Sequence, residues 1–330
     1  MDIDRRTYDL MRLIRENEPI GSIRLVDLMN RHGYSIKSRT IRLILSELDE
    51  KAFTEKVPGK GRKLTAAGRA ELGRGNIAGR FGHIREKIVT LTSQVTYDPV
   101  EDAGEVVAGS AVVPHDSVDE ALSVLDDLAD SSLGPVVTAT DAVDEGVRFQ
   151  FPSSITLDGV LLSRGINTTL KTAGLVEYRS TPGEPTTPGE VVRYIDVING
   201  EGSTMDVVTL LIEAGRTDVL GALVRDTGIL IVDNREFPIT RFEEARDLAI
   251  TTTTLLGGAL DVRRPREQGP IPFENPGWEF ASLTYGAIGE LAIALLHELE
   301  LVSQWETLDG LVPRREFEPL QTAGVSLTER

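Results

Sequence analysis

Residues 38–69 read SRTIRLILSELDEKAFTEKVPGKGRKLTAAGR, and this stretch decides the fold of the N-terminal part of the chain. Apolar side chains recur at helical spacing along one face, at Ile41, Ile44, Leu45 and Leu48. This spacing predicts a helix with Ser38 as its N-cap. Two short strands follow at 53–57 and 62–64, around a Pro-Gly hairpin tip, and Thr65 is placed to cap the next helix.

Two further helices precede this stretch. The apolar spacing of residues 4–17 predicts the first, and residues 23–31, with Ser22 as N-cap, predict the second. The order helix, helix, turn, helix, hairpin is that of a winged helix, in which the third helix enters the major groove of DNA and the hairpin forms the wing.

The candidate DNA contacts lie on this third helix and on the wing. They are Lys37, Ser38, Arg39, Thr40, Arg42, Lys60, Arg62 and Lys63. We expect Arg39 and Arg42 to reach base edges and the three wing cations to meet phosphate. A winged helix that contacts another protein is the alternative. The wing sequence GKGRK lacks the full phosphate-loop pattern, so a nucleotide-hydrolysing site is not expected.

Charge is divided unevenly along the chain. The net charge is -17, yet residues 1–92 hold 19 Lys and Arg against 12 Asp and Glu, whereas residues 93–330 hold 16 against 40. A basic segment attached to an acidic body is typical of a DNA-binding module joined to a part that does not touch DNA. Adaptation of the body surface to high salt is an equally good explanation of its acidity.

Several protein classes are disfavoured by composition. The 330 residues include no cysteine, which argues against disulfides and thiolate sites, and the first residues lack the apolar core of a signal peptide. No stretch is apolar enough to span a membrane, so we expect a cytoplasmic protein. The four histidines lie far apart and no common catalytic motif occurs. We therefore expect no metal, no resident cofactor and no enzyme.

The rest of the chain predicts an α/β (α+β) regulatory domain, so that the whole is a two-domain protein. We place the winged helix at 1–75, a connector helix at 76–97 and the regulatory domain at 98–330. Residues 114–121 resemble residues 238–245, and each segment follows a strand and begins a helix. This echo suggests two related lobes, at 100–200 and 226–330, with a ligand cleft near their junction, although chance similarity would give the same pattern.

An anion site is predicted between these lobes. Small residues open a helix after position 200, and free backbone N–H groups at a helix start suit a carboxylate. The candidate effector-binding residues are Gly202, Ser203, Thr204, Arg216 and Arg235. The alternative is that Ser203 and Thr204 only cap the helix.

Five segments of the body carry a family resemblance. They are LDGVLLSRGI at 157–166, AGLVE at 173–177, GSTMD at 202–206, AGRTDVLG at 214–221 and NREFP at 234–238. Together with the winged helix, they make the chain similar to the NrpR-type nitrogen-regulatory repressors of archaea. The resemblance covers nearly the whole chain, which carries one regulatory unit where some members have two.

The resemblance implies a homodimeric or higher repressor. Such a repressor binds palindromic double-stranded DNA operators of nitrogen-assimilation genes and releases them when 2-oxoglutarate, a small dicarboxylate, binds the regulatory domain. The alternatives are a winged-helix regulator that answers a different small acid, and an enzyme with a winged-helix appendage.

Overall fold

The computed structural model describes residues 5–74, 84–181, 187–199, 207–270 and 276–323. The chain divides into two units, Met1–Thr90 and Leu91–Arg330. Both combine helices with antiparallel sheets, so the predicted α/β two-domain class is confirmed. The division falls within α6 (Ile84–Gln94), inside the region predicted as the connector, part of which lies outside the described residues.

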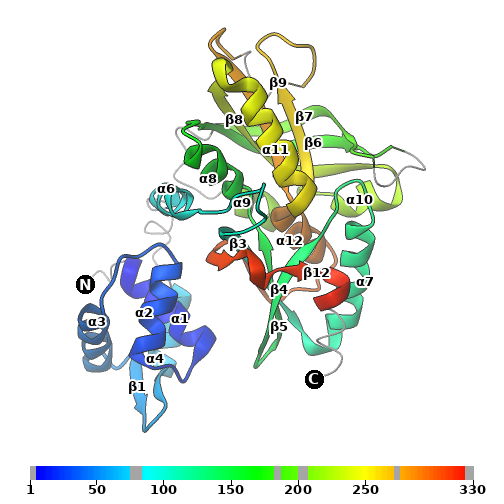
Figure 1. The fold of residues 1–330 in the computed structure, drawn as a ribbon. Helices are drawn as coiled ribbons and strands as arrows, with labels where there is room; N and C mark the ends of the chain where they lie inside the picture. Colours follow the sequence, from blue (N-terminus) through cyan, green and yellow to red (C-terminus); the bar gives the residue numbers. More distant parts are fainter. Residues whose placement is uncertain (1–4, 75–83, 182–186, 200–206, 271–275, 324–330) are drawn as a thin grey trace. The chain divides into compact units, whose positions relative to one another are not determined.

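The smaller unit begins with three helices (Figure 1). They are α1 (Arg5–Asn17), α2 (Ser22–Arg31) and α3 (Ser38–Glu50). Each buries the apolar face that its spacing predicts, and the shared core is built from Leu10, Met11, Ile14, Leu25, Met29, Ile41, Leu45 and Leu48. Packing of these faces on one another holds the three short helices together.

A hairpin follows these helices. Strand β1 (Thr54–Val57) pairs antiparallel with β2 (Gly61–Leu64), and α4 (Ala66–Arg74) closes the unit. The backbone of Ile20 bridges to Arg62 through N–H···O bonds of 3.0 and 2.9 Å and so adds a one-residue pairing at the edge of β2. Gly61 allows this approach, because its φ is +124° and a Cβ there would lie 2.1 Å from the Ile20 carbonyl oxygen.

Two of the three predicted caps were wrong by one residue. The N-cap positions of α2 and α3 are Gly21 and Lys37, and neither makes a side-chain cap bond, so Ser22 and Ser38 are the first helical residues. The Lys37 carbonyl already accepts the first backbone bonds of α3, which moves the helix start back by one position. Thr65 is a cap as predicted, since its Oγ1 accepts the Gly68 N–H at 3.0 Å.

Over its described residues, the larger unit forms two five-stranded antiparallel sheets, with strand orders β11-β3-β5-β4-β12 and β7-β6-β8-β10-β9. The strands of the first sheet are β3 (Glu105–Pro114), β4 (Val137–Val143), β5 (Gly146–Pro152), β11 (Gln304–Pro313) and β12 (Glu318–Pro319). The strands of the second sheet are β6 (Thr169–Arg179), β7 (Glu190–Asn199), β8 (Thr227–Pro238), β9 (Gly258–Arg263) and β10 (Phe280–Ala287).

Helices connect and cover these sheets. They are α7 (Val118–Ala129), α8 (Ile155–Ser163), α9 (Val207–Glu213), α10 (Val219–Val224), α11 (Phe242–Leu256) and α12 (Ile288–Glu298). Three short 3₁₀ turns directly follow strands that end in proline, at η1 (His115–Ser117), η2 (Ile239–Arg241) and η3 (Arg314–Glu316). Proline has no N–H to donate to a ladder, which suits the end of a strand.

The order of elements occurs twice in this unit. The first repeat, residues 105–179, runs β3-η1-α7-β4-β5-α8-β6, and the second, residues 227–313, runs β8-η2-α11-β9-β10-α12-β11. The last strand of each repeat pairs in the sheet of the other, because β6 pairs with β8 and β11 pairs with β3. The two sheets therefore do not coincide with the predicted sequence lobes, since each takes strands from both halves.

Helix α12 forms the centre of the core. It lies between the two sheets (Figure 1) and contacts strands of both. All its residues from Ile288 to Leu296 are buried. Around it pack the largest apolar cluster of the chain, including Phe149, Phe151 and Leu175. A sequence without helical polarity, IGELAIALL, is what a helix buried on all sides requires, and within it Glu290 is the exception.

Candidate nucleic-acid interface and buried charge cluster

The exposed face of α3 carries the cations that the sequence predicted. Lys37, Arg39 and Arg42 are exposed, whereas Ser38 and Thr40 are half-buried at the helix start. Within the described part of the chain, no hydrogen bond or ion pair engages Lys37, Arg39 or Arg42. These three side chains are therefore free to meet an anion.

Charge also changes along the axis of α3. Its exposed acidic residues, Glu47 and Glu50, lie in the C-terminal half, and the cations lie at the N-terminal end. The helix dipole adds positive potential at this same end. A polyanion is therefore attracted to the first two turns of α3 and repelled from the last.

The wing cations differ in their surroundings. Lys60 is exposed at the hairpin tip and, like the α3 cations, has no partner among the described residues. Lys63 lies 3.0 Å from Glu55 across the hairpin, with both side chains about half exposed. Such an exposed pair is weak, so Lys63 can exchange its partner for another anion.

Arg62 connects the wing to α3. Its Nη2 donates to Asp49 Oδ2 at 2.9 Å and its Nε donates to both carboxylate oxygens at 3.1 Å. Partial burial of Asp49 is outweighed by the hydrogen bonds from Arg62 and Thr54, which hold the pKa of Asp49 below its ordinary value. Arg62 thus orients the wing, with its guanidinium already occupied by a carboxylate.

Sequence reasoning missed further exposed residues on this surface. Lys56 lies on β1 directly opposite Arg62, and Arg24 lies on the first turn of α2. Leu43 is exposed on α3 between the cations and the acidic end. The alternation of β1 and the helical spacing of 39, 42, 43 and 46 were signals that would have identified Lys56 and Leu43.

The predicted effector residues are not all brought together. Gly202, Ser203 and Thr204 lie outside the described residues. Arg216 is about half exposed, with its Nη2 3.7 Å from Asp196 of β7. Arg235 lies on β8 and is fully buried, with different partners, so the two arginines occupy separate surroundings.

A buried charge cluster surrounds Arg235. Its Nε donates to Asp158 Oδ1 of α8 at 2.6 Å, and its Nη2 lies 3.6 Å from Asp233 Oδ2. Burial disfavours the charged guanidinium, but attraction to Asp158 and Asp233 outweighs burial and keeps the pKa of Arg235 above its ordinary value. Arg235 therefore stays charged inside the protein.

Glu290 of α12 completes this cluster. Its Oε1 accepts hydrogen bonds from Ser153 Oγ at 2.7 Å and from the Ser154 N–H at 3.0 Å. Burial raises the pKa of Glu290 to about 7, because these bonds do not offset the loss of water and the charge of Asp233 opposes ionisation. Among the residues that the structure describes, none bonds to its buried Oε2. Glu290 is therefore protonated or charged depending on small changes of pH around neutrality.

The cluster joins the two repeats. Asp158 and Ser154 belong to the first repeat and Asp233, Arg235 and Glu290 to the second. Ser154 bonds to both carboxyl groups of the second repeat, since its Oγ also donates to Asp233 Oδ2 at 2.6 Å. Any change in how the repeats pack must rearrange these buried bonds, which are costly to leave unmade.

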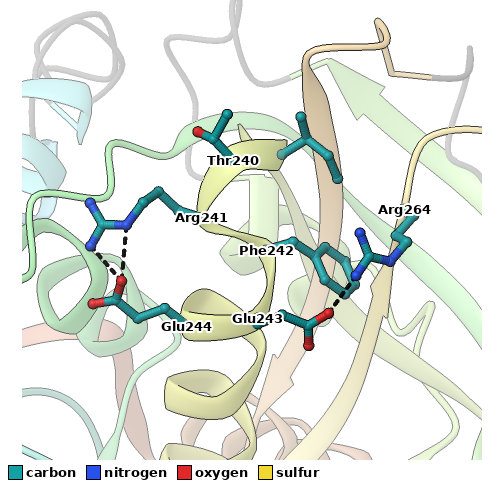
Figure 2. A pocket seen from close by; sticks show the side chains of 7 residues that line it. Thr240, Arg241, Phe242, Glu243, Glu244 and Arg264 are labelled. Carbon is teal, nitrogen blue, oxygen red and sulfur yellow. Dashed lines mark hydrogen bonds and ion pairs between the residues drawn. The ribbon is translucent and has the colours of Figure 1, made fainter.

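A surface pocket of about 290 Å³ opens beside the start of α11, as Figure 2 shows. Arg241 at its edge donates to Glu244 Oε2 from Nε at 2.9 Å and from Nη2 at 2.6 Å. On the other side Arg264 pairs with Glu243, and its guanidinium carbon lies 4.0 Å from the Phe242 ring centroid. Each arginine is engaged by a carboxylate, so the pocket rim is balanced in charge.

No described helix is both long and apolar enough to cross a membrane. Over the same residues, no group of three or more His, Asp or Glu side chains is arranged to hold a metal ion.

Comparison with known protein families finds two matches. The profile of the family described as NrpR regulatory domains NRD1 and 2 matches residues 81–318. The profile of the ribonuclease R winged-helix domain matches residues 8–72. The chain is also similar in fold to a solved nitrogen repressor-like protein from Methanococcus jannaschii, with a TM-score of 0.55 over 71% of this chain and 97% of that chain, at 19% identity.

Three relatives are named global nitrogen regulators. NrpRI of Methanosarcina mazei is 26% identical over 253 residues, which are 73% of this chain and 75% of that protein. NrpR of Methanocaldococcus jannaschii is 28% identical over 73% of this chain and 43% of its own length. NrpR of Methanococcus maripaludis is 27% identical over 68% and 40%. The chain thus spans less than half the length of the last two.

Proposed function

Because the chain belongs to the family of NrpR regulatory domains, we propose that it is a DNA-binding transcriptional repressor of nitrogen-assimilation genes whose operator binding is relieved by 2-oxoglutarate. The observation that carries this proposal is the set of unengaged cations at the N-terminal end of α3, next to a wing, in a chain of strongly acidic net charge. The relatives are named regulators, which favours a regulator over an enzyme.

The contacts with DNA would be made by α3 and the wing. Arg39 and Arg42 have the donor geometry to bond guanine edges in the major groove, and Lys60 and Lys63 suit phosphate. Arg62 would act mainly by holding the wing against α3, because Asp49 already occupies its guanidinium. The long side chain of Lys56 adds a further cation to the hairpin.

The effector site would lie in the larger unit. We assign Arg216 to a carboxylate of 2-oxoglutarate, since its present partner Asp196 is 3.7 Å away and both side chains are about half exposed. Gly202, Ser203 and Thr204 would supply backbone and hydroxyl donors. Arg235 could bind a carboxylate of 2-oxoglutarate only if the ligand displaced Asp158 from it. Such a displacement would first break the bonds of the buried charge cluster.

Release of DNA would follow from a change in the placement of two winged helices. In a cytoplasmic homodimer, two α3 helices read half-sites about one helical turn apart. 2-Oxoglutarate shifts the balance between arrangements only to the extent that it binds one of them more tightly. Repacking of the two repeats around the buried cluster is the rearrangement that the fold offers.

Calorimetric titration of the full chain with 2-oxoglutarate tests this function, at a salt concentration at which the protein is stable. We expect saturable binding, and we expect weaker binding of glutarate, which lacks the keto oxygen. Arg216→Ala should weaken binding about tenfold or more, the loss of one charge-assisted contact. The matched control is Arg193→Ala, an exposed arginine of β7 paired with Glu177. The absence of any heat of binding at millimolar 2-oxoglutarate would exclude it as the effector. Saturable binding of a different small acid would identify that acid as the effector instead.

A further inference from the structure

An exposed apolar side chain, Leu43, lies next to the free cations of α3, on the side of the acidic end of the helix. Leu43 is 57% exposed, although the other leucines and isoleucines of this helix are buried in the core. Among the described residues, Leu43 is neither a buried member of the apolar cluster of the smaller unit nor one of the partly buried side chains packed against it. The fold of this unit therefore gives no reason for a leucine at this position.

The helical spacing places Leu43 beside the free cations. Residues 39, 42, 43 and 46 share one face, because positions three and four apart are neighbours on a helix. Leu43 thus follows Arg39 by one turn and directly adjoins Arg42, with the acidic end of α3 beyond it. A rise of about 1.5 Å per residue puts Leu43 about 6 Å further along the helix axis than Arg39.

We propose that Leu43 determines operator specificity by contacting the 5-methyl group of a thymine in the major groove. This inference rests on the proposed DNA-binding function. Thymine is the base that presents a methyl group there, and apolar side chains recognise it by contact. The free arginines Arg39 and Arg42 lie on the N-terminal side of Leu43, and this positive end of α3 attracts a polyanion, which favours DNA over a second protein surface as the occupant.

The position of the thymine follows from the helix. Base pairs are about 3.4 Å apart along one strand, so a side chain about 6 Å beyond Arg39 reaches about two base pairs further. The operator half-site should therefore contain a guanine contacted by Arg39 or Arg42 and a thymine within about two base pairs of it. An operator without such a thymine would offer Leu43 no methyl group to contact.

The test uses duplexes selected by the full-length protein from a random pool. Each thymine of the selected half-site is replaced in turn by deoxyuridine, which removes only the 5-methyl group. We expect one replacement per half-site to weaken binding of the unmodified protein about fourfold, the effect of one methyl group returned to water. The same replacement should leave the affinity of Leu43→Ala unchanged.

A matched control is Ile23→Ala, which removes a comparable exposed apolar side chain from α2 rather than α3. This variant should keep the full dependence on the methyl group. Equal deoxyuridine effects in Leu43→Ala and the unmodified protein, or none in either, would overturn the inference while leaving DNA binding intact. Failure to select any duplex would instead overturn the proposed function. A change of oligomeric state in Leu43→Ala would assign the residue to a protein interface and also overturn the inference.

Discussion

The protonation of the buried Glu290 carboxyl group affects the stability of the larger unit. In the folded chain its pKa is raised to about 7 by burial, from an ordinary value of 4.5. The folded state therefore holds this proton more tightly than the unfolded state does. The resulting stabilisation is fully present below pH 4.5 and is lost as pH rises through 7.

We predict that Glu290→Gln removes this part of the pH dependence. Glutamine keeps the shape of the protonated carboxyl group but cannot ionise. The difference in unfolding free energy between variant and unmodified protein should grow in favour of the variant by about 3 kcal/mol from acid to mildly alkaline pH. Denaturant unfolding measured at intervals between pH 4 and pH 8 checks this.

Glu120→Gln is the control for this prediction, because Glu120 is an exposed carboxyl group on α7. Its unfolding free energy should follow that of the unmodified protein at every pH. A constant offset between Glu290→Gln and the unmodified protein across the whole pH range would contradict the raised pKa.

Single residues were predictable from the sequence where their role is local. Arg39 and Arg42 follow from the helical spacing around them, and the structure leaves both exposed. The partners of Arg235 were not predictable, because Asp158 lies 77 positions away in the chain. Glu290 and Ser153 are 137 positions apart, and only the folded packing brings their side chains together.

At the scale of elements, the ion pair between Arg62 and Asp49 helps to orient the wing, together with the backbone bonds between Ile20 and Arg62. Asp49 near the end of α3 receives three hydrogen bonds from Arg62 of β2, and both side chains are only about one-fifth exposed. Partly buried, charge-assisted bonds of this kind are stronger than surface ion pairs. The hairpin is therefore held to α3, the helix that we propose to enter the major groove of DNA.

We predict that Asp49→Asn loosens the wing. The variant should lose roughly 1–2 kcal/mol of unfolding free energy, because the bonds to a charged group are weakened. Affinity for a selected operator should fall several-fold although no cation has been removed. A loss of both stability and affinity would show that the orientation of the wing, and not only its charge, contributes to operator binding. Denaturant unfolding and a binding titration check the two effects.

Glu55→Gln is the matched control, since it breaks the exposed pair with Lys63 on the same hairpin. It should cost less than about 1 kcal/mol and should leave operator affinity unchanged or raised. Equal effects of Asp49→Asn and Glu55→Gln would show that the buried pair has no special role.

Helices with a strong apolar periodicity were predicted well from the sequence. The pairing of strands into sheets was predicted less well. The helices of the smaller unit match their spacing, apart from one-residue errors at two caps. The repeated strand-turn-helix order was visible in the echo between 114–121 and 238–245. The exchange of β6 and β11 between sheets was not visible, because sequence shows the order of strands and not their partners.

At the scale of the whole molecule, the chain joins a basic unit, which we propose to bind DNA, to an acidic unit that matches the NrpR regulatory domains. The 40 acidic residues after position 92 outnumber the 16 basic ones there, so we expect that unit to repel DNA and the proposed contacts to lie on α3 and the wing. In the proposed function, the effect of 2-oxoglutarate is transmitted from the larger unit to the smaller one. One measurement reports both DNA binding and its regulation, namely operator affinity as a function of 2-oxoglutarate concentration.

The most direct test is therefore a binding titration of the full-length protein on a selected operator, with and without saturating 2-oxoglutarate. We predict a fall in operator affinity of at least tenfold, within the usual range of coupling between two sites, and no specific binding at any concentration of 2-oxoglutarate for the double variant Arg39→Ala, Arg42→Ala. Operator affinity that is unchanged by saturating 2-oxoglutarate, or undiminished in the double variant, would contradict the account.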